Sequence, residues 1–122
     1  MGFGGLLQEL RIAKEVSLRE MGKEVGLSAI YISDMERGHR RAPSSEVILR
    51  IADYLQTDPA PLLRAALAER RTVEFELTEG QTKGARGDFI LALARVWNEM
   101  EDEAFEALNQ HLEQDKERKD KR

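Results

Sequence analysis

The sequence predicts a mainly α-helical protein, with five short helices in residues 1–71, then a short strand, then a C-terminal α-helical element. Three observations predict it. Apolar residues recur at helical spacing through the first 70 residues, serine and glycine stand where those helices would begin and end, and one later segment alternates instead. The 122 residues, 41% of them hydrophobic, suffice for one core with a smaller element attached.

The first two helices have clear limits. The first ends near Lys14, and its apolar residues recur at helical spacing: Phe3, Leu6, Leu7, Leu10 and Ala13. The second runs over 18–25, because Ser17 is a suitable N-cap and Glu20 completes a capping box with it.

Gly26 is expected to end the second helix, since a tight reversal needs the left-handed backbone that glycine adopts readily. Ser28 then caps a third helix that runs to about Arg37 and is stopped by Gly38.

Two more helices complete the predicted bundle. Ser44 or Ser45 caps the fourth, whose apolar face consists of Val47, Ile48, Ile51, Ala52 and Leu55. Asp58 and Pro59 open the fifth, because proline is well placed in a first helical turn. The apolar side of this fifth helix consists of Leu62, Leu63 and Leu67.

The period changes after Arg71. Val73, Phe75 and Leu77 alternate with polar residues, which predicts a short strand with one apolar face. A strand needs a partner, and since no second strand pattern is visible, we expect the same strand of another copy to supply it. Residues 79–87 contain three glycines and are predicted to be a flexible connection.

A long helical stretch follows, capped by Asp88 and with a break expected near Glu101; the pattern leaves open whether 88–115 forms one helix or two. Its apolar face comprises Phe89, Leu93, Val96, Trp97, Met100, Ala104, Phe105, Leu108 and Leu112. This face exceeds what a lone helix keeps in water, so it packs either on its own domain or on a partner. The expected domains are thus 1–71, 72–115 and a disordered charged tail, 116–122.

The charge is unevenly distributed. The formal net charge is −4, with 11 Lys/Arg against 10 Asp/Glu (+1) in 1–71 and 8 against 13 (−5) in 72–122. Arg37, Arg40 and Arg41 nevertheless form a local basic cluster beside His39. Cysteine is absent, and no apolar run approaches the roughly 20 residues that span a bilayer, so we expect a cytoplasmic protein without membrane contact.

The sequence offers no catalytic constellation. There is no nucleophile elbow, P-loop or dinucleotide motif. His39 and His111 lack the spacing of zinc ligands, and the acidic residues 99–103 fit a solvated helix face better than a metal or acid–base site. We therefore expect no enzymatic activity, no metal and no cofactor.

Residues 17–38 carry the functional signal, because they predict two helices that cross closely at a steep angle. Gly22 stands where a larger side chain would block the approach. The buried seam is expected to contain Met21, Val25, Leu27, Ile32 and Met35. Such a helix-turn-helix holds its second helix outward, so that its N-terminal half can enter the major groove of DNA. The alternative is that the same fold serves protein contacts.

The pattern over about 3–67 resembles the XRE family, the phage repressor and Cro class of helix-turn-helix regulators. The motifs that carry the resemblance are Leu10-Arg11, Ser17, Gly22, Val25-Gly26-Leu27-Ser28, Tyr31-Ile32-Ser33, Glu36-Arg37-Gly38, Pro43, Ile51-Ala52 and Asp58-Pro59. The resemblance implies a repressor-like DNA-binding domain. Its groove-facing positions would be Ser28, Ala29, Ile30, Ser33 and Asp34. It also implies phosphate contacts from Arg37, Arg40 and Arg41, and a structural ion pair between Arg11 and Glu36.

The chain departs from the family at readout positions. Leu18 stands where a phosphate-binding glutamine is common, and the neighbouring Arg19 is the expected substitute. Ala29 and Ile30 have no hydrogen-bonding groups for base edges, whereas Asp34 suits the amino group of cytosine. We therefore expect sparse direct readout, supplemented by DNA shape and bridging water.

The resemblance implies a transcriptional regulator, expected to be a repressor that reads a palindromic operator in double-stranded DNA as a homodimer. The expected dimerisation residues are Val73, Phe75, Leu77, Phe89, Leu93, Trp97, Met100, Phe105 and Leu108. The alternative is an antitoxin or adaptor whose C-terminal segment binds a partner protein and whose DNA binding is autoregulatory.

Overall fold

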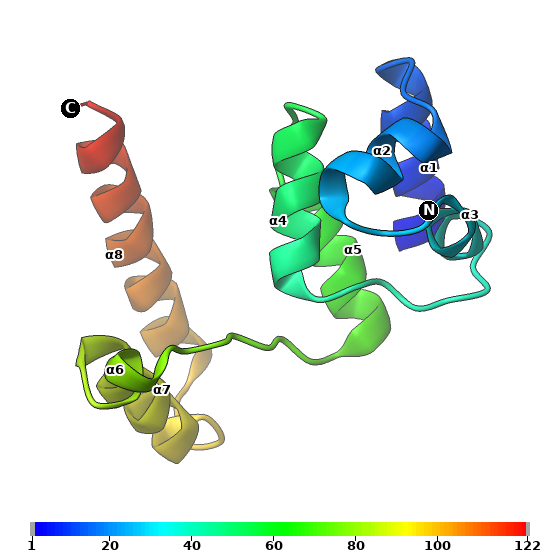
Figure 1. The fold of residues 1–122 in the computed structure, drawn as a ribbon. Helices are drawn as coiled ribbons and strands as arrows, with labels where there is room; N and C mark the ends of the chain where they lie inside the picture. The colour runs from blue at the N-terminus through cyan, green and yellow to red at the C-terminus, as the bar shows by residue number, and fades with distance from the viewer. Residues whose placement is uncertain (1, 122) are drawn as a thin grey trace. The chain divides into compact units, whose positions relative to one another are not determined.

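The computed structural model describes residues 2–121, and the described chain divides into two units, Met1–Glu76 and Leu77–Arg122 (Figure 1). The prediction of a mainly helical protein is confirmed. The described helices are α1 (Phe3–Ala13), α2 (Leu18–Val25), α3 (Ala29–Glu36), α4 (Ser45–Tyr54), α5 (Ala60–Arg70), α6 (Glu79–Thr82), α7 (Ala85–Val96) and α8 (Asp102–Asp120).

The first unit is the predicted bundle of five helices. Helix α1 packs against α3 and α5, α2 packs against α3 and α4, and α4 packs against α5. The buried apolar residues of the described chain all lie between Phe3 and Ala66. They are Phe3, Leu7, Met21, Val25, Ile32, Met35, Ala42, Ile48, Ile51, Ala52, Leu55, Leu62 and Ala66. Within residues 2–121, the hydrophobic core therefore belongs to this unit alone.

The helix starts follow the expected caps. At α2, Ser17 Oγ accepts a hydrogen bond from the Glu20 backbone at 3.0 Å and Glu20 Oε1 accepts one from the Ser17 backbone at 3.3 Å, so the capping box is confirmed. At α3, Ser28 Oγ accepts from the Tyr31 backbone at 3.0 Å. At α4, Ser44 occupies the N-cap position, but its side chain makes no capping hydrogen bond.

The predicted strand over 73–77 is wrong for the single chain. Residues 71–78 have neither helical nor strand structure. The physical reason is that a strand exists only beside a second one, and the described residues provide no ladder partner. Alternation describes the spacing of apolar residues along the chain, and it cannot supply the pairing that a strand needs.

The expected flexible connection over 79–87 is also wrong. Thr78 and Gln81 form a second capping box, with hydrogen bonds of 3.2 and 3.0 Å, that starts α6. Gly87 is buried, and a Cβ there would lie 2.2 Å from the carbonyl oxygen of Thr82, so α6 and α7 touch closely. Gly84 rather than Asp88 occupies the N-cap of α7; Asp88 lies in its first turn.

The break expected near Glu101 is confirmed, since 88–115 belongs to two helices, α7 and α8. Helix α8 continues through residues 116–120, which were expected to be disordered. Asp115 contacts both Arg118 and Lys119, one turn further along. These hydrogen bonds, Lys119 first, lower the pKa of Asp115. Such pairs explain helix in a charged segment without apolar contacts.

Between residues 2 and 121, no helix is both long enough and apolar enough to cross a membrane.

Candidate nucleic-acid interface

The turn between α2 and α3 depends on two glycines. Gly26 ends α2 with φ of 77°, the left-handed conformation that the sequence predicted. Gly22 lies against the backbone of the turn, where a Cβ would be 2.3 Å from the carbonyl oxygen of Leu27. A side chain at position 22 would therefore force α2 and α3 apart, which confirms the close crossing predicted for this pair.

The seam between these helices is closed. Met21 and Val25 of α2, and Ile32 and Met35 of α3, are buried, and Leu27 in the turn is half-buried. One face of α3 therefore belongs to the core. Its remaining surface faces outward from the unit, as a DNA-reading helix requires.

The predicted ion pair between Arg11 of α1 and Glu36 of α3 is confirmed. Arg11 Nε and Nη2 donate to the two carboxylate oxygens of Glu36 at 2.7 and 2.9 Å, and Arg11 Nη1 donates to the carbonyl oxygen of Val16 at 2.8 Å. The hydrogen bond to Glu36, opposed by desolvation, raises the pKa of Arg11. Because Glu36 is only 8% exposed, this bidentate pair fixes the end of α3 rather than reading DNA.

The predicted groove-facing residues lie on or beside the first turns of α3. Ile30 is 75% exposed and Ser28 is exposed, while Ala29, Ser33 and Asp34 are half-buried. The Ser28 oxygen already accepts the capping hydrogen bond, so its hydroxyl remains available as a donor. The exposed apolar side chain of Ile30 suits contact with a thymine methyl group.

Two of the arginines expected to contact phosphate lie beside Asp34. Arg37 Nη2 lies 3.3 Å from Asp34 Oδ1, and Arg40 Nε lies 3.7 Å from Asp34 Oδ2. The Arg40 guanidinium also stacks over Tyr31, 4.6 Å from the ring centroid. Arg41 is exposed in the loop to α4, and Arg19 is exposed on α2. Arg37 and Arg40 thus lie together near the C-terminal end of α3, and Arg41 follows Arg40 in the chain.

Sequence reasoning missed two participants in this surface. Tyr31 supports Arg40 through the stacking contact, although neither helical periodicity nor charge indicated it. Arg50 of α4 places a guanidinium nitrogen 3.9 Å from where a Cβ on Gly26 would lie, which adds a cation beside the turn. That approach depends on the packing of α2 against α4, so no local pattern could have revealed it.

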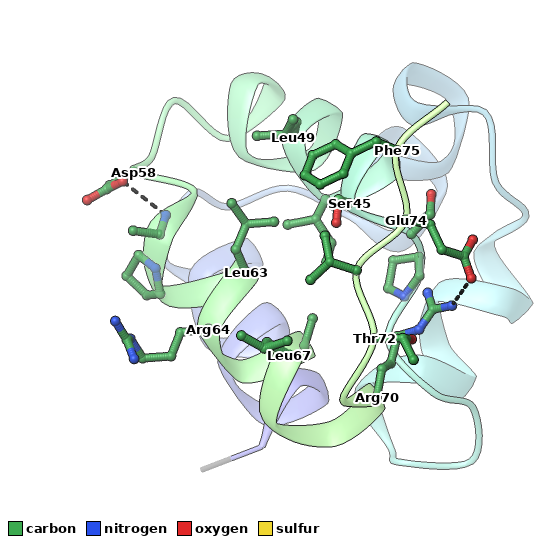
Figure 2. A pocket seen from close by; sticks show the side chains of 17 residues that line it. Ser45, Leu49, Asp58, Leu63, Arg64, Leu67, Arg70, Thr72, Glu74 and Phe75 are labelled. Carbon is green, nitrogen blue, oxygen red and sulfur yellow. Dashed lines mark hydrogen bonds and ion pairs between the residues drawn. The ribbon is translucent and has the colours of Figure 1, made fainter. Parts of the chain in front are cut away.

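An apolar groove of about 700 Å³ forms a second candidate surface on the first unit. Figure 2 shows Leu49 of α4 near Phe75, with Leu63 and Leu67 on the α5 side. Val73 and Phe75, two of the predicted dimerisation residues, line this groove. Phe75 is 71% exposed and therefore leaves the groove largely unfilled.

The other predicted dimerisation residues belong to the second unit. Phe89, Trp97 and Leu108 are exposed there, while Leu77, Leu93, Met100 and Phe105 are half-buried. The structure brings Trp97 and Phe105 together in an edge-to-face contact, with centroids 5.3 Å apart and an interplanar angle of 69°. This aromatic contact spans the break between α7 and α8.

No cluster of three or more potential metal ligands occurs within the described part of the chain.

Comparison with known proteins places the first unit. The model of a helix-turn-helix domain family matches residues 3–67, which is more than half of the chain. A curated relative, the ImmF control region 10 kDa protein of Bacillus phage phi105, is 38% identical over 55 residues, or 45% of this chain; the match spans only 60% of that relative.

Two solved structures are each similar to about half of the chain. The P22 c2 repressor, in complex with a synthetic operator, is 29% identical, with a TM-score of 0.48 and coverage of 53% of this chain and 97% of that one. The clp gene regulator ClgR of C. glutamicum is 32% identical, with a TM-score of 0.47 and coverage of 54% and 84%.

Proposed function

The chain belongs to the helix-turn-helix domain family, as its resemblance to XRE-type regulators predicted, and from this premise we propose that it binds double-stranded DNA through α3 and regulates transcription. One observation carries the proposal. Ile30 of α3 and its N-cap Ser28 are exposed, and Arg37 and Arg40 flank this surface at the other end of the helix. A helix of this kind fits the major groove, while cations beside it neutralise phosphates.

The division of labour follows from chemistry. Ser28, Ala29, Ile30, Ser33 and Asp34 face bases, while Arg19, Arg37, Arg40 and Arg41 contact the backbone. Hydroxyl and methyl groups allow only a few base contacts, so phosphate contacts and DNA shape supply much of the binding free energy.

The test compares two exposed isoleucines. Ile30 on α3 and Ile12 on α1 are 75% and 58% exposed, so a glutamate at either position leaves the core intact. Duplexes are first selected by the wild-type chain from a random pool. We expect Ile30→Glu to weaken binding to the selected duplex at least about tenfold, because a carboxylate then faces the bases and phosphates. The control Ile12→Glu should bind as the wild type does. If both variants bind the selected duplex equally well, α3 does not contact DNA.

We further propose that the protein is a homodimeric repressor of a palindromic operator. One helix-turn-helix contacts few base pairs, so pairing doubles the reach. The apolar groove beside Val73 and Phe75, and the exposed side chains of the second unit, support a protein-covered surface. Light scattering after size exclusion gives the mass directly, and a monomer at micromolar concentration would contradict dimerisation.

A second candidate function is that of an antitoxin or adaptor. It is favoured by the exposure of the second unit, which has no buried apolar side chain among the described residues. Between Arg95 and Lys116 it has seven acidic and no Lys or Arg residues, so its partner would combine apolar and basic groups. If the isolated chain is monomeric and its second unit unfolds first on heating, this candidate gains over the homodimer.

A further inference from the structure

The contact of α1 with α3 contains a backbone approach that only glycine permits. A Cβ on Gly4 would lie 2.1 Å from the carbonyl oxygen of Met35 and 2.8 Å from that of Glu36. Side-chain carbons essentially never come within 3.0 Å of such atoms. Both neighbours are backbone atoms at the end of α3, so no side-chain rotation could relieve the clash. Gly4 therefore sets the minimum separation between the start of α1 and the end of α3.

The same end of α3 is held a second time from α1. Arg11 donates two hydrogen bonds to the Glu36 carboxylate, and Leu7, which lies between Gly4 and Arg11 in the sequence, is buried. The other end of α3 is set by Gly22 against the turn. Each end of the helix thus rests on a close backbone contact made by a glycine of another helix, Gly22 at the start and Gly4 at the finish.

We infer that Gly4 is a positioning residue for DNA reading, one that sets the tilt of α3 although it lies on α1 and outside the DNA-facing surface. The inference rests on the proposed function. Alanine at position 4 requires a displacement of at least 0.9 Å, the difference between 2.1 and 3.0 Å. Base contacts tolerate displacements of only about 0.5 Å. Long arginine side chains adjust over that range, so phosphate contacts persist.

The experiment measures discrimination. Wild type, Gly4→Ala and Gly2→Ala are titrated against the duplex that the wild type selects and against an unrelated duplex of equal length. Gly2 is the matched control, because a Cβ there meets nothing within 4 Å at the start of the same helix. For Gly4→Ala we expect a loss of about tenfold or more on the selected duplex, the size of one lost base contact. Its binding to the unrelated duplex and its salt dependence should stay within twofold of the wild type. Gly2→Ala should match the wild type on both duplexes.

A second variant covers the case in which Gly4→Ala fails to fold, which urea unfolding followed by circular dichroism would show. Arg11→Lys retains a cation beside Glu36 but gives up the bidentate geometry, so it loosens the same end of α3 without a backbone clash. It should show the same selective loss of discrimination.

Three results separate the hypotheses. If the wild type selects no duplex, the proposed function fails and the inference fails with it. If the wild type discriminates and folded Gly4→Ala, or Arg11→Lys in its place, discriminates equally well, the inference alone fails. A parallel loss of binding to both duplexes also overturns it, because that result indicates general destabilisation.

Discussion

The carboxylate of Asp34 could accept a hydrogen bond from a cytosine amino group, but in the folded chain it contacts two arginines. Its two carboxylate oxygens face Arg37 and Arg40, at 3.3 and 3.7 Å. Reading a cytosine amino group would require at least one arginine to move away. We therefore assign Asp34 first to holding these arginines, and only second to base contact. The exposed pairs contribute little stability, at most about 1 kcal/mol.

This assignment predicts the effect of Asp34→Asn. The substitution keeps the shape, removes one negative charge from the DNA-facing surface and releases two guanidinium groups to phosphates. We expect binding to an unrelated duplex to strengthen severalfold and the salt slope to steepen by up to about one unit. Fluorescence anisotropy at several salt concentrations measures both. Asp53→Asn, on the exposed side of α4, serves as the control and should change neither quantity. Weaker binding to all duplexes would contradict the arginine-holding role.

Individual residues were predictable from sequence when they followed a pattern of known meaning. The Arg11–Glu36 pair came from the family resemblance, and Gly26 from the need for a left-handed turn; both are confirmed. Tyr31 under Arg40, and the Gly4 contact with Met35, were not predictable. They depend on where α3 meets its neighbours in space, and sequence spacing does not encode that distance.

At the scale of the helices, local capping chemistry decided which boundaries could be predicted. Helix α2 begins and ends at the predicted residues because Ser17, Glu20 and Gly26 act within one turn of chain. The start of α7 was predicted at Asp88, because aspartate is a common N-cap residue. The helix begins earlier, after Gly84, which has no side chain that could indicate a cap. The strand failed for a different reason, since pairing is not a local property.

The serine caps give a matched prediction. Ser17 and Ser44 both occupy N-cap positions, but only Ser17 makes the capping hydrogen bond. Ser17→Ala should lower the free energy of unfolding by about 1 kcal/mol, because an orphan backbone donor loses its partner. Ser44→Ala should have an effect near zero. Urea denaturation of both variants provides the measurement. If the two losses are equal, the capping box does not stabilise α2.

At the scale of the whole molecule, the chain concentrates its buried apolar residues in one unit and its acidity in the other. All buried apolar side chains of the described residues precede Arg71, and the net charge of −5 follows it. The charge asymmetry was readable from the sequence. The division after Glu76 was not, because residues 72–75 line the groove of the first unit instead of joining the second.

Shortened chains test the proposed contribution of each part. A chain ending at Arg71 keeps the whole core, so it should unfold cooperatively, but it should be monomeric and bind the selected duplex at least about tenfold more weakly. A chain ending at Glu76 also keeps Val73 and Phe75 beside the groove. If the chain ending at Glu76 forms dimers, the groove contributes to the dimer interface. If it is monomeric like the chain ending at Arg71, dimerisation requires the second unit. Analytical ultracentrifugation distinguishes these cases, and a dimeric chain ending at Arg71 would contradict both.

The contact between Trp97 and Phe105 at the joint of α7 and α8 provides an intrinsic fluorescence probe. Trp97 is the sole tryptophan of the chain, and it lies 58% exposed beside Phe105. Its fluorescence emission therefore reports on this joint alone, while the five-helix bundle contributes no indole signal. A blue shift of this emission with increasing protein concentration would show, without any label, that the Trp97 ring becomes buried. A change in the emission on adding DNA would show that DNA binding by the bundle alters the surroundings of Trp97.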